Sequence, residues 1–156
     1  MTYQEYRQSE EKVANGLPIF FAFSTEQFKD ALKQRGYETL EAAKGHVVRV
    51  GNSGGFCLDK DVDTVKAYFN RPKQLPELMK EEAFAVEAFE YEMENHEYAI
   101  NYYQGDWDVC SCFCECEYAD DKDWKDYLRE GGYNDDVLRY FKKALSVYRE
   151  KSKDWY

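Results

Sequence analysis

The sequence predicts an α+β fold, in which a small antiparallel sheet with a β-hairpin packs against a long central helix and several shorter helices. Apolar residues recur at helical spacing in several segments, and short apolar runs lie beside glycine turns. These helices and hairpins follow one another without the regular alternation of a β-α-β fold. Aromatic residues form 17% of the 156 residues, which excludes a disordered chain because that many rings can bury a core.

The first elements are marked by capping residues. Residues 2–14 predict a helix because Thr2 and Glu5 form a T-x-x-E capping box at its start. The short apolar run at residues 18–23 then predicts a buried strand. Ser24 caps a second helix, which continues with apolar residues at helical spacing up to the next glycine.

A glycine-rich turn at residues 51–55 separates two strand-like segments. Residues 46–50 predict one strand, and residues 56–58 predict its return as a hairpin. A helix follows that begins at Asp59 or Asp61 and ends before the next proline, because a residue preceding proline avoids the helical region. The turn lacks the lysine of a phosphate-binding loop, so we interpret it as structural.

Residues 77–96 carry the longest helical pattern, the predicted central helix. Its apolar residues form two stripes on nearly opposite sides, which indicates packing on both faces. A polar stripe between them holds the acidic residues Glu87, Glu90, Glu94 and Glu97. One apolar stripe ends at His96.

The last third of the chain predicts a second hairpin and two helices. Residues 98–103 and 107–116 flank a short loop containing glycine, which favours a β-hairpin. Asp123 and Asn134 are placed as caps of the two final helices. The absence of repeats and linkers predicts a single domain over residues 1–156.

The net charge of −10 is concentrated in one part of the chain, residues 77–136, which we name the acidic block. It holds 19 acidic and 4 basic residues, whereas residues 1–76 hold 10 and 11 and residues 137–156 hold 2 and 6. Such a block repels nucleic acids and anionic membranes and attracts basic protein surfaces. The simplest interpretation is a solvated acidic surface. No apolar stretch is long enough for a membrane helix, and residues 1–12 lack a secretory signal, so we expect a cytoplasmic location.

Four cysteines alternate with other residues along the second strand of the expected hairpin: Cys110, Cys112, Cys114 and Cys116. Alternate residues of a strand share one face, and the outer two would lie ~20 Å apart, too far to surround one metal ion. We therefore predict cysteines packed in the core, with a metal site and a redox function as alternatives. No disulfide framework is expected, since the cysteine count of five is odd and the chain looks intracellular. No cofactor is expected either.

His96 is the possible functional residue among the two histidines. It ends the central helix beside Glu97, and a carboxylate neighbour could orient it as a general base. A capping or core histidine is favoured because no recognisable motif places a nucleophile near it. We assign no catalytic residue and no metal ligand, and no role to His46.

Three segments of the sequence resemble a known family. They are residues 87–109 (EAFEYEMENHEY followed by AINYYQGDWDV), residues 17–28 (LPIFFAFSTEQF) and the Gly-Gly-Phe element at residues 54–56. They are similar to an uncharacterised family of small acidic proteins encoded by phages and mobile elements of Firmicutes, a domain of unknown function. The resemblance implies a bacterial cytoplasm and a phage or plasmid origin, and it supplies no catalytic residue.

The sequence thus favours a non-enzymatic protein that binds a protein partner with a basic surface through the acidic block. The expected contact residues are Glu87, Glu90, Glu94 and Glu97. One alternative is an inhibitor of a nucleic-acid-binding host defence protein, acting as a partial DNA mimic. Another is a small enzyme that uses His96. Direct binding to nucleic acid or to a membrane is not expected.

Overall fold

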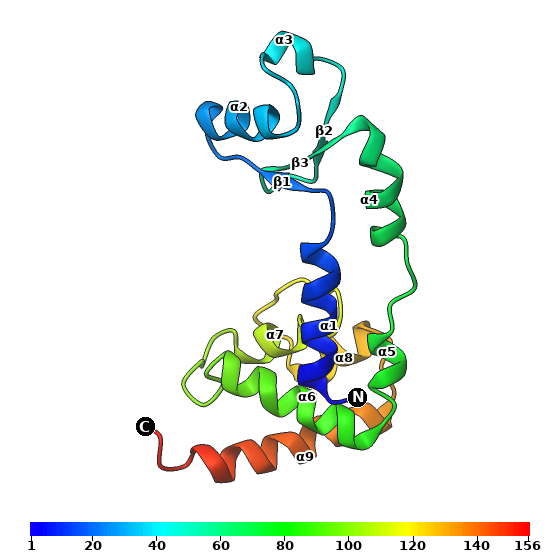
Figure 1. Ribbon diagram of the computed structural model, residues 1–156. Helices are drawn as coiled ribbons and strands as arrows, with labels where there is room; N and C mark the ends of the chain where they lie inside the picture. The colour runs from blue at the N-terminus through cyan, green and yellow to red at the C-terminus, as the bar shows by residue number, and fades with distance from the viewer. The chain divides into compact units, whose positions relative to one another are not determined.

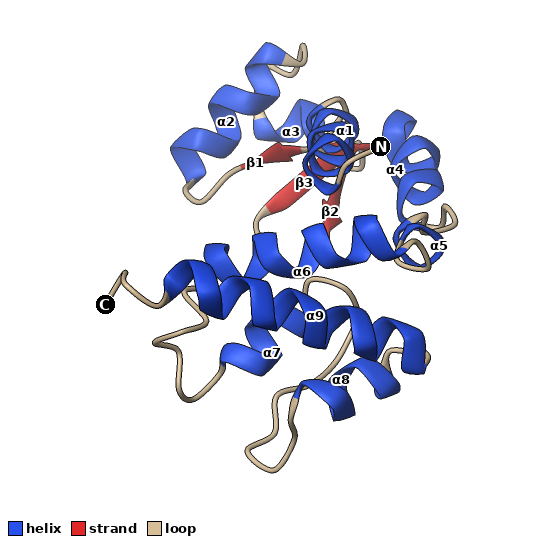
Figure 2. Cartoon of the chain, turned by 90° about the horizontal axis from the view of Figure 1, so that it is seen from below, coloured by secondary structure: helices blue, strands red, loops and turns tan.

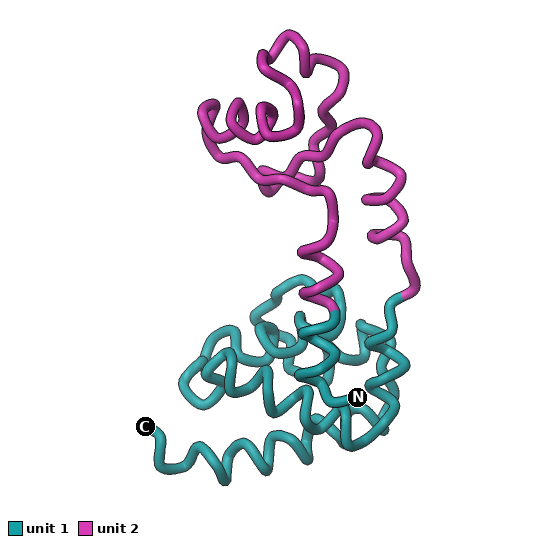
Figure 3. The backbone as a smooth tube through the Cα atoms, in the orientation of Figure 1, with its two compact units in different colours: residues 1–9, 73–156 teal, residues 10–72 magenta.

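The computed structural model describes residues 1–156, which divide into two compact units (Figure 3). Unit 1 comprises residues 1–9 and 73–156, and unit 2 comprises residues 10–72. Helices and a three-stranded antiparallel sheet occur together, which confirms the predicted α+β class (Figure 2). The prediction of a single domain stays a prediction.

Unit 1 is built from helices. It begins with the first part of α1 (Tyr3–Asn15), a helix that continues into unit 2 (Figure 1). Its other helices are α5 (Leu75–Leu78), α6 (Glu82–Asn95), α7 (Gly105–Cys110), α8 (Trp124–Glu130) and α9 (Asp135–Ser152). The helices α6 and α9 lie side by side (Figure 2). None of the helices combines the length and the apolar character that crossing a membrane requires.

Aromatic side chains dominate the core of unit 1. The ring of Phe89 in α6 packs edge-on against Phe141 of α9, with centroids 4.9 Å apart. Trp124 also stacks on Phe141, with centroids 4.4 Å apart. On another face of α6, Phe84 packs against Tyr3 of α1 at 5.8 Å. Burying each such ring contributes roughly 1.5–3 kcal/mol to folding, so these contacts hold α6 between its neighbours.

Unit 2 contains the sheet. Its strands are β1 (Phe20–Phe21), β2 (Val47–Val50) and β3 (Gly55–Leu58), in the order β1-β3-β2 with both pairs antiparallel. The predicted hairpin of β2 and β3 is confirmed, with Val50 opposite Gly55 next to the turn. Gly54 is required there: its φ is +82°, and an added Cβ would lie 2.7 Å from the ring of Phe23.

Short helices flank the sheet of unit 2. They are α2 (Thr25–Gln34), α3 (Leu40–Ala43), the 3₁₀ helix η1 (Asp59–Asp61) and α4 (Val62–Phe69). Phe20 of the sheet, Leu32 of α2 and Ala43 of α3 form the buried core of this unit. The sequence pattern did not predict α3, which has only four residues and is held by its cap Thr39.

Four of the predicted helix caps are present, whereas Asp61, which precedes α4, makes no side-chain cap hydrogen bond. The Glu5 N–H donates to Thr2 Oγ1 at 3.1 Å and the Thr2 N–H donates to Glu5 Oε2 at 2.7 Å, which completes the capping box of α1. Ser24, Asp123 and Asn134 likewise accept backbone N–H groups at the starts of α2, α8 and α9. Local side-chain chemistry therefore sets where four of the helices begin.

The central helix predicted over residues 77–96 is divided into α5 and α6. Pro76 stands in the first turn of α5, and Glu81 adopts an extended backbone with φ −84° and ψ 118°. This break turns Met79 fully into the core. The two-sided burial is confirmed; the buried side chains of α6 are Phe84, Ala85, Ala88, Phe89, Glu92 and Met93.

The hairpin predicted over residues 98–103 and 107–116 is wrong, because neither segment contains a strand. Helix α7 occupies part of it, and the buried positions Val109, Cys110 and Phe113 have helical rather than alternating spacing. The four cysteines thus alternate along the sequence, but the buried residues of this segment do not follow the same two-residue period. The expected packing of the sheet against the central helix stays a prediction.

Candidate functional site

A buried carboxylate, Glu92, organises a polar cluster at the end of α6. Its side chain is 3% exposed, and the Tyr3 hydroxyl donates to its Oε1 at 2.7 Å. Arg7 Nη1 also donates to Oε1, at 3.2 Å, and Asn95 Nδ2 donates to Oε2 at 3.1 Å. A buried carboxylate is costly unless it is paired and hydrogen-bonded, and these three donors meet that requirement.

His96 lies against this carboxylate and against a cysteine. Glu92 and His96 are four residues apart, so they share one helix face, and His96 Nε2 is 3.5 Å from Glu92 Oε2. The same Nε2 is 3.4 Å from the Sγ of Cys112, which lies just after α7. The residue that contacts the imidazole is therefore Glu92 and not the adjacent Glu97 considered from the sequence.

The cluster does not have the geometry of a cysteine nucleophile. In a cysteine–histidine–acid triad the thiol and the acid contact opposite ring nitrogens, whereas Cys112 and Glu92 both approach Nε2 of His96. Burial, followed by the charge of Glu92, raises the pKa of Cys112 to about 12. The thiol therefore stays neutral near pH 7 and is a poor nucleophile.

The same three side chains offer donors suited to a metal ion. Glu92 Oε2, His96 Nε2 and Cys112 Sγ supply an oxygen, a nitrogen and a sulfur, and the cluster's ligand atoms lie within 4.8 Å of one another. Sequence reasoning missed this group for two reasons. It placed the cysteines on a strand, and it did not recognise the E-x-x-x-H spacing of Glu92 and His96 as a shared face.

The other cysteines have different surroundings. Cys57 and Cys110 are fully buried, and burial raises the pKa of the Cys110 thiol. Cys114 is half-buried and its thiol donates to the carbonyl oxygens of Cys110 and Tyr127. All five cysteines are free thiols. Cys112 differs from the rest because it contacts His96.

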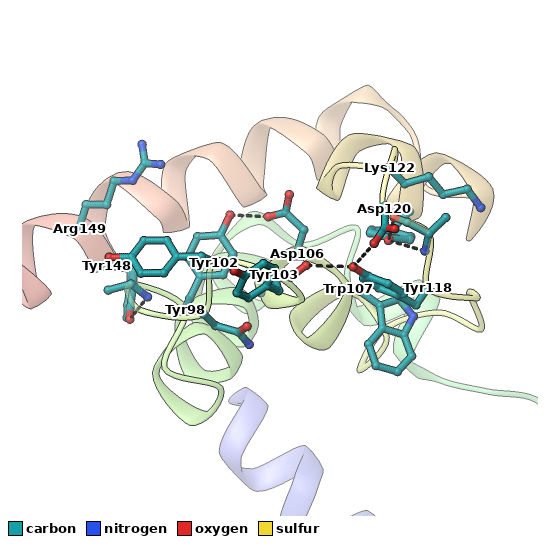
Figure 4. A pocket seen from close by; sticks show the side chains of 15 residues that line it. Tyr98, Tyr102, Tyr103, Asp106, Trp107, Tyr118, Asp120, Lys122, Tyr148 and Arg149 are labelled. Atoms are coloured by element: carbon teal, nitrogen blue, oxygen red, sulfur yellow. Dashed lines mark hydrogen bonds between the residues drawn. The ribbon is translucent and has the colours of Figure 1, made fainter.

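A second feature of unit 1 is an open cavity of about 440 Å³, which we name the tyrosine cavity (Figure 4). Six tyrosines line it: Tyr98, Tyr102, Tyr103, Tyr118, Tyr127 and Tyr148. Tyr102 and Tyr103 are 86% and 90% exposed. His96 is not among the lining residues, so the cavity and the Glu92 cluster are separate features.

Charged groups are arranged along the tyrosine cavity. Asp106 lies in its middle and accepts hydrogen bonds from the Tyr98 hydroxyl and from the Trp124 N–H (Figure 4). Asp120 and Lys122 lie at one end and Arg149 at the other (Figure 4). Lys122 is already paired with Glu130 at 2.7 Å.

The four glutamates expected to contact a partner do not form an uninterrupted row. Lys151 Nζ lies 2.8 Å from Glu90 and 4.0 Å from Glu94. Glu97 lies beyond the end of α6 with a φ of +49°. Glu87 is half-buried and makes no ion pair.

The net charge divides sharply between the two units. Unit 1 contains 22 acidic and 12 basic residues, and unit 2 contains 9 of each. Unit 1 therefore carries the whole net charge of −10, and unit 2 is neutral.

The comparisons with known proteins identify a family. Residues 2–108 match the model of a family of unknown function, DUF7659. The chain belongs to this family. The match includes Glu92, His96 and the loop of Tyr102, and it ends before Cys112. No curated protein and no solved structure matches the chain.

Proposed function

We propose that the protein is a non-enzymatic binding protein whose unit 1 recognises a basic segment of a partner protein through the tyrosine cavity. The observation that supports this most is the exposure of Tyr102 and Tyr103, at 86% and 90%, beside a cavity of about 440 Å³. Tyrosine is enriched among the residues that dominate binding energy at protein interfaces. Neighbouring exposed rings beside a cavity are typical of an interaction site.

The chemistry of the cavity favours a cationic side chain of the partner. Tyrosine faces attract guanidinium and ammonium groups, and Asp106 and Asp120 add carboxylates to the lining. The charge of −10 on unit 1 steers a basic segment toward this surface. Lys122 opposes it little because Glu130 neutralises its charge.

The position of Arg149 determines where in the tyrosine cavity we expect a cationic side chain of the partner to bind. It lies at the opposite end of the cavity from Asp120 and forms no ion pair (Figure 4). A bound cation would be repelled there and attracted at the end of Asp120. We therefore place the basic side chain of the partner between Asp120 and the exposed tyrosines.

Two alternative functions require other structural features. A phage or mobile-element inhibitor in a bacterial cytoplasm would also bind a basic partner, but as a DNA mimic it needs carboxylates in regular rows. The pairing of Glu90 with Lys151 interrupts such a row. An enzyme using His96 would place the substrate at the Glu92 cluster and not at the tyrosine cavity.

The proposal can be tested with the full chain and synthetic peptides. An arginine- and lysine-rich peptide and a glutamate-rich peptide of equal length are titrated while tryptophan fluorescence is recorded, to which Trp107 of the cavity lining contributes. We expect binding of the basic peptide alone. The double variant Tyr102→Ala/Tyr103→Ala should weaken it by a factor of about 30, the effect of losing about 2 kcal/mol at an interface hot spot.

Matched variants decide among the alternatives. Phe69→Ala removes an exposed ring from unit 2 and should leave binding unchanged. Equal binding of both peptides, or full binding by the double tyrosine variant, contradicts the proposal. If Glu87→Gln/Glu94→Gln abolishes binding and the tyrosine variant retains it, the DNA-mimic alternative is supported instead.

A further inference from the structure

We propose that Glu92, His96 and Cys112 bind one Zn²⁺ ion, a site that does not depend on the partner-binding proposal. The three residues come from two parts of unit 1 that are 16 positions apart in sequence, the last turn of α6 and the segment after α7. Helix geometry places Glu92 and His96 on one face. The fold then brings the sulfur of Cys112 to the same ring nitrogen that faces Glu92.

Two of the three distances between the donor atoms match those around a zinc ion, and the third, between the Glu92 carboxylate and Cys112 Sγ, is within 4.8 Å. Zinc binds sulfur at about 2.3 Å, imidazole nitrogen at about 2.0–2.1 Å and carboxylate oxygen at about 2.0–2.2 Å, in a tetrahedral arrangement. Tetrahedral angles then separate neighbouring donor atoms by about 3.3–3.6 Å. In the structure, His96 Nε2 is 3.4 Å from Cys112 Sγ and 3.5 Å from Glu92 Oε2.

The surroundings of Glu92 leave one oxygen for the ion. Tyr3 and Arg7 both bond to Oε1, so they orient the carboxylate without using Oε2, the oxygen near His96. Such outer contacts are typical of metal-binding carboxylates. Oε2 accepts one hydrogen bond, from Asn95, and a carboxylate oxygen has a second lone pair for a cation.

The donor set selects the class of metal. A thiolate and an imidazole favour zinc and related transition metals over Mg²⁺ or Ca²⁺, which prefer oxygen ligands. On binding, the Cys112 thiol releases its proton to solvent and coordinates as the thiolate. Thiolate and carboxylate balance the two charges of the ion. His96 and Cys112 are partly exposed, so water can take the fourth position.

Such an ion would join three segments of unit 1. Through its ligands it connects α6 to the irregular segment after α7, and through the bonds of Glu92 it restrains Tyr3 and Arg7 of α1. This arrangement predicts stabilisation of the folded protein by zinc.

The test uses the full chain, freed of metal by a chelator and then titrated with Zn²⁺ against a chromophoric competitor. We expect one tight equivalent per chain and a higher melting temperature with Zn²⁺ and not with Mg²⁺. Cys112→Ser and His96→Ala should each weaken binding at least ~100-fold, since even outer-shell changes cost about 10–100-fold. Cobalt(II) should give a thiolate-to-metal charge-transfer band that Cys112→Ser abolishes.

Two controls come from the same segments. Cys114→Ser removes a neighbouring half-buried thiol, and Glu97→Gln removes the carboxylate next to His96; both should bind zinc like the original chain. Circular dichroism in the absence of metal verifies that every variant folds. The proposal is overturned if zinc binds only weakly at several sites, if Cys112→Ser binds as tightly as the original chain, or if Cys114→Ser removes the cobalt band.

Discussion

Several tyrosine hydroxyls of unit 1 are held as donors in partly or fully buried positions. Burial and then the hydrogen bond to Asp106 raise the pKa of Tyr98 far above its usual range. Burial also raises the pKa of Tyr133, whose hydroxyl donates to the carbonyl oxygen of Phe113 at 2.8 Å. These residues link the loops to the helices, and each link requires the protonated hydroxyl.

This protonation predicts that the protein loses stability at alkaline pH. Above pH ~10 an unfolded chain releases tyrosine protons that the folded chain retains, so the unfolded state binds fewer protons there. The free energy of unfolding is therefore fully retained below pH ~10 and falls as the pH rises above it. Tyr98→Phe removes one of these protons. The free energy of unfolding, measured with urea at a series of pH values above ~9, should then fall less steeply with pH, by the contribution of up to about one proton. Tyr102→Phe, at an exposed ring, should not, and equal slopes for Tyr98→Phe and the original chain would contradict the assignment.

Among the elements, α8 depends most visibly on its cap. Asp123 Oδ1 accepts the N–H groups of Lys125 and Asp126, and Asp126 Oδ2 accepts the N–H of Asp123 at 3.0 Å. A helix of seven residues has little stability of its own. The capping box and the burial of Tyr127 and Leu128 therefore hold it in place.

Loss of this cap should be measurable. Asp123→Ala is expected to lower the free energy of unfolding by about 1 kcal/mol, because the two hydrogen bonds that the Asp123 side chain accepts disappear. Asp121→Ala makes the same change of charge two residues earlier at an exposed position and should have little effect. Both are measured by thermal unfolding, where the expected shift is about 2–4 °C for a chain of this size. Equal melting temperatures for the two variants would show that the capping box does not stabilise the fold.

The elements also show which features the sequence could predict. Helix starts were predictable because a cap such as Ser24 acts on N–H groups only a few residues away. The segment after residue 98 was not, because its conformation is decided by distant partners such as Phe89, which packs against Phe113, and Tyr148, which packs against Tyr98. The alternating cysteines imitated a strand, while burial followed Val109, Cys110 and Phe113.

The candidate site was predictable only in part, for the same reason. His96 was identified from its position at the end of the central helix, and the spacing to Glu92 is visible in the sequence. The contribution of Cys112 depends on how α7 packs near the end of α6, which local patterns do not encode. Glu92 would be placed on the surface by composition alone, and its burial requires Tyr3 and Arg7, more than 80 positions away.

On the scale of the whole molecule, the region that matches the family ends before the residues that complete the core of unit 1. The match ends at residue 108, within α7. The core of α6 is completed by α9, where Phe141 packs against Phe89. A relative that shares only the matched region must therefore cover the apolar face of α6 with other residues, since exposing it would cost the burial energy of those rings.

The segregation of charge makes a last prediction, that salt stabilises this protein. Unit 1 carries a net charge of −10, and its carboxylates repel one another in the folded state. Raising NaCl from ~10 mM to ~150 mM shortens the Debye length from about 30 Å to about 8 Å, and should raise the free energy of unfolding by about 1 kcal/mol. Glu117→Gln/Asp121→Asn should raise stability at low salt and reduce the effect of NaCl, whereas Glu11→Gln/Glu38→Gln in neutral unit 2 should change neither. A stability that falls with salt would mean that attractive pairs such as Lys143–Glu82 and Lys151–Glu90 outweigh the repulsion.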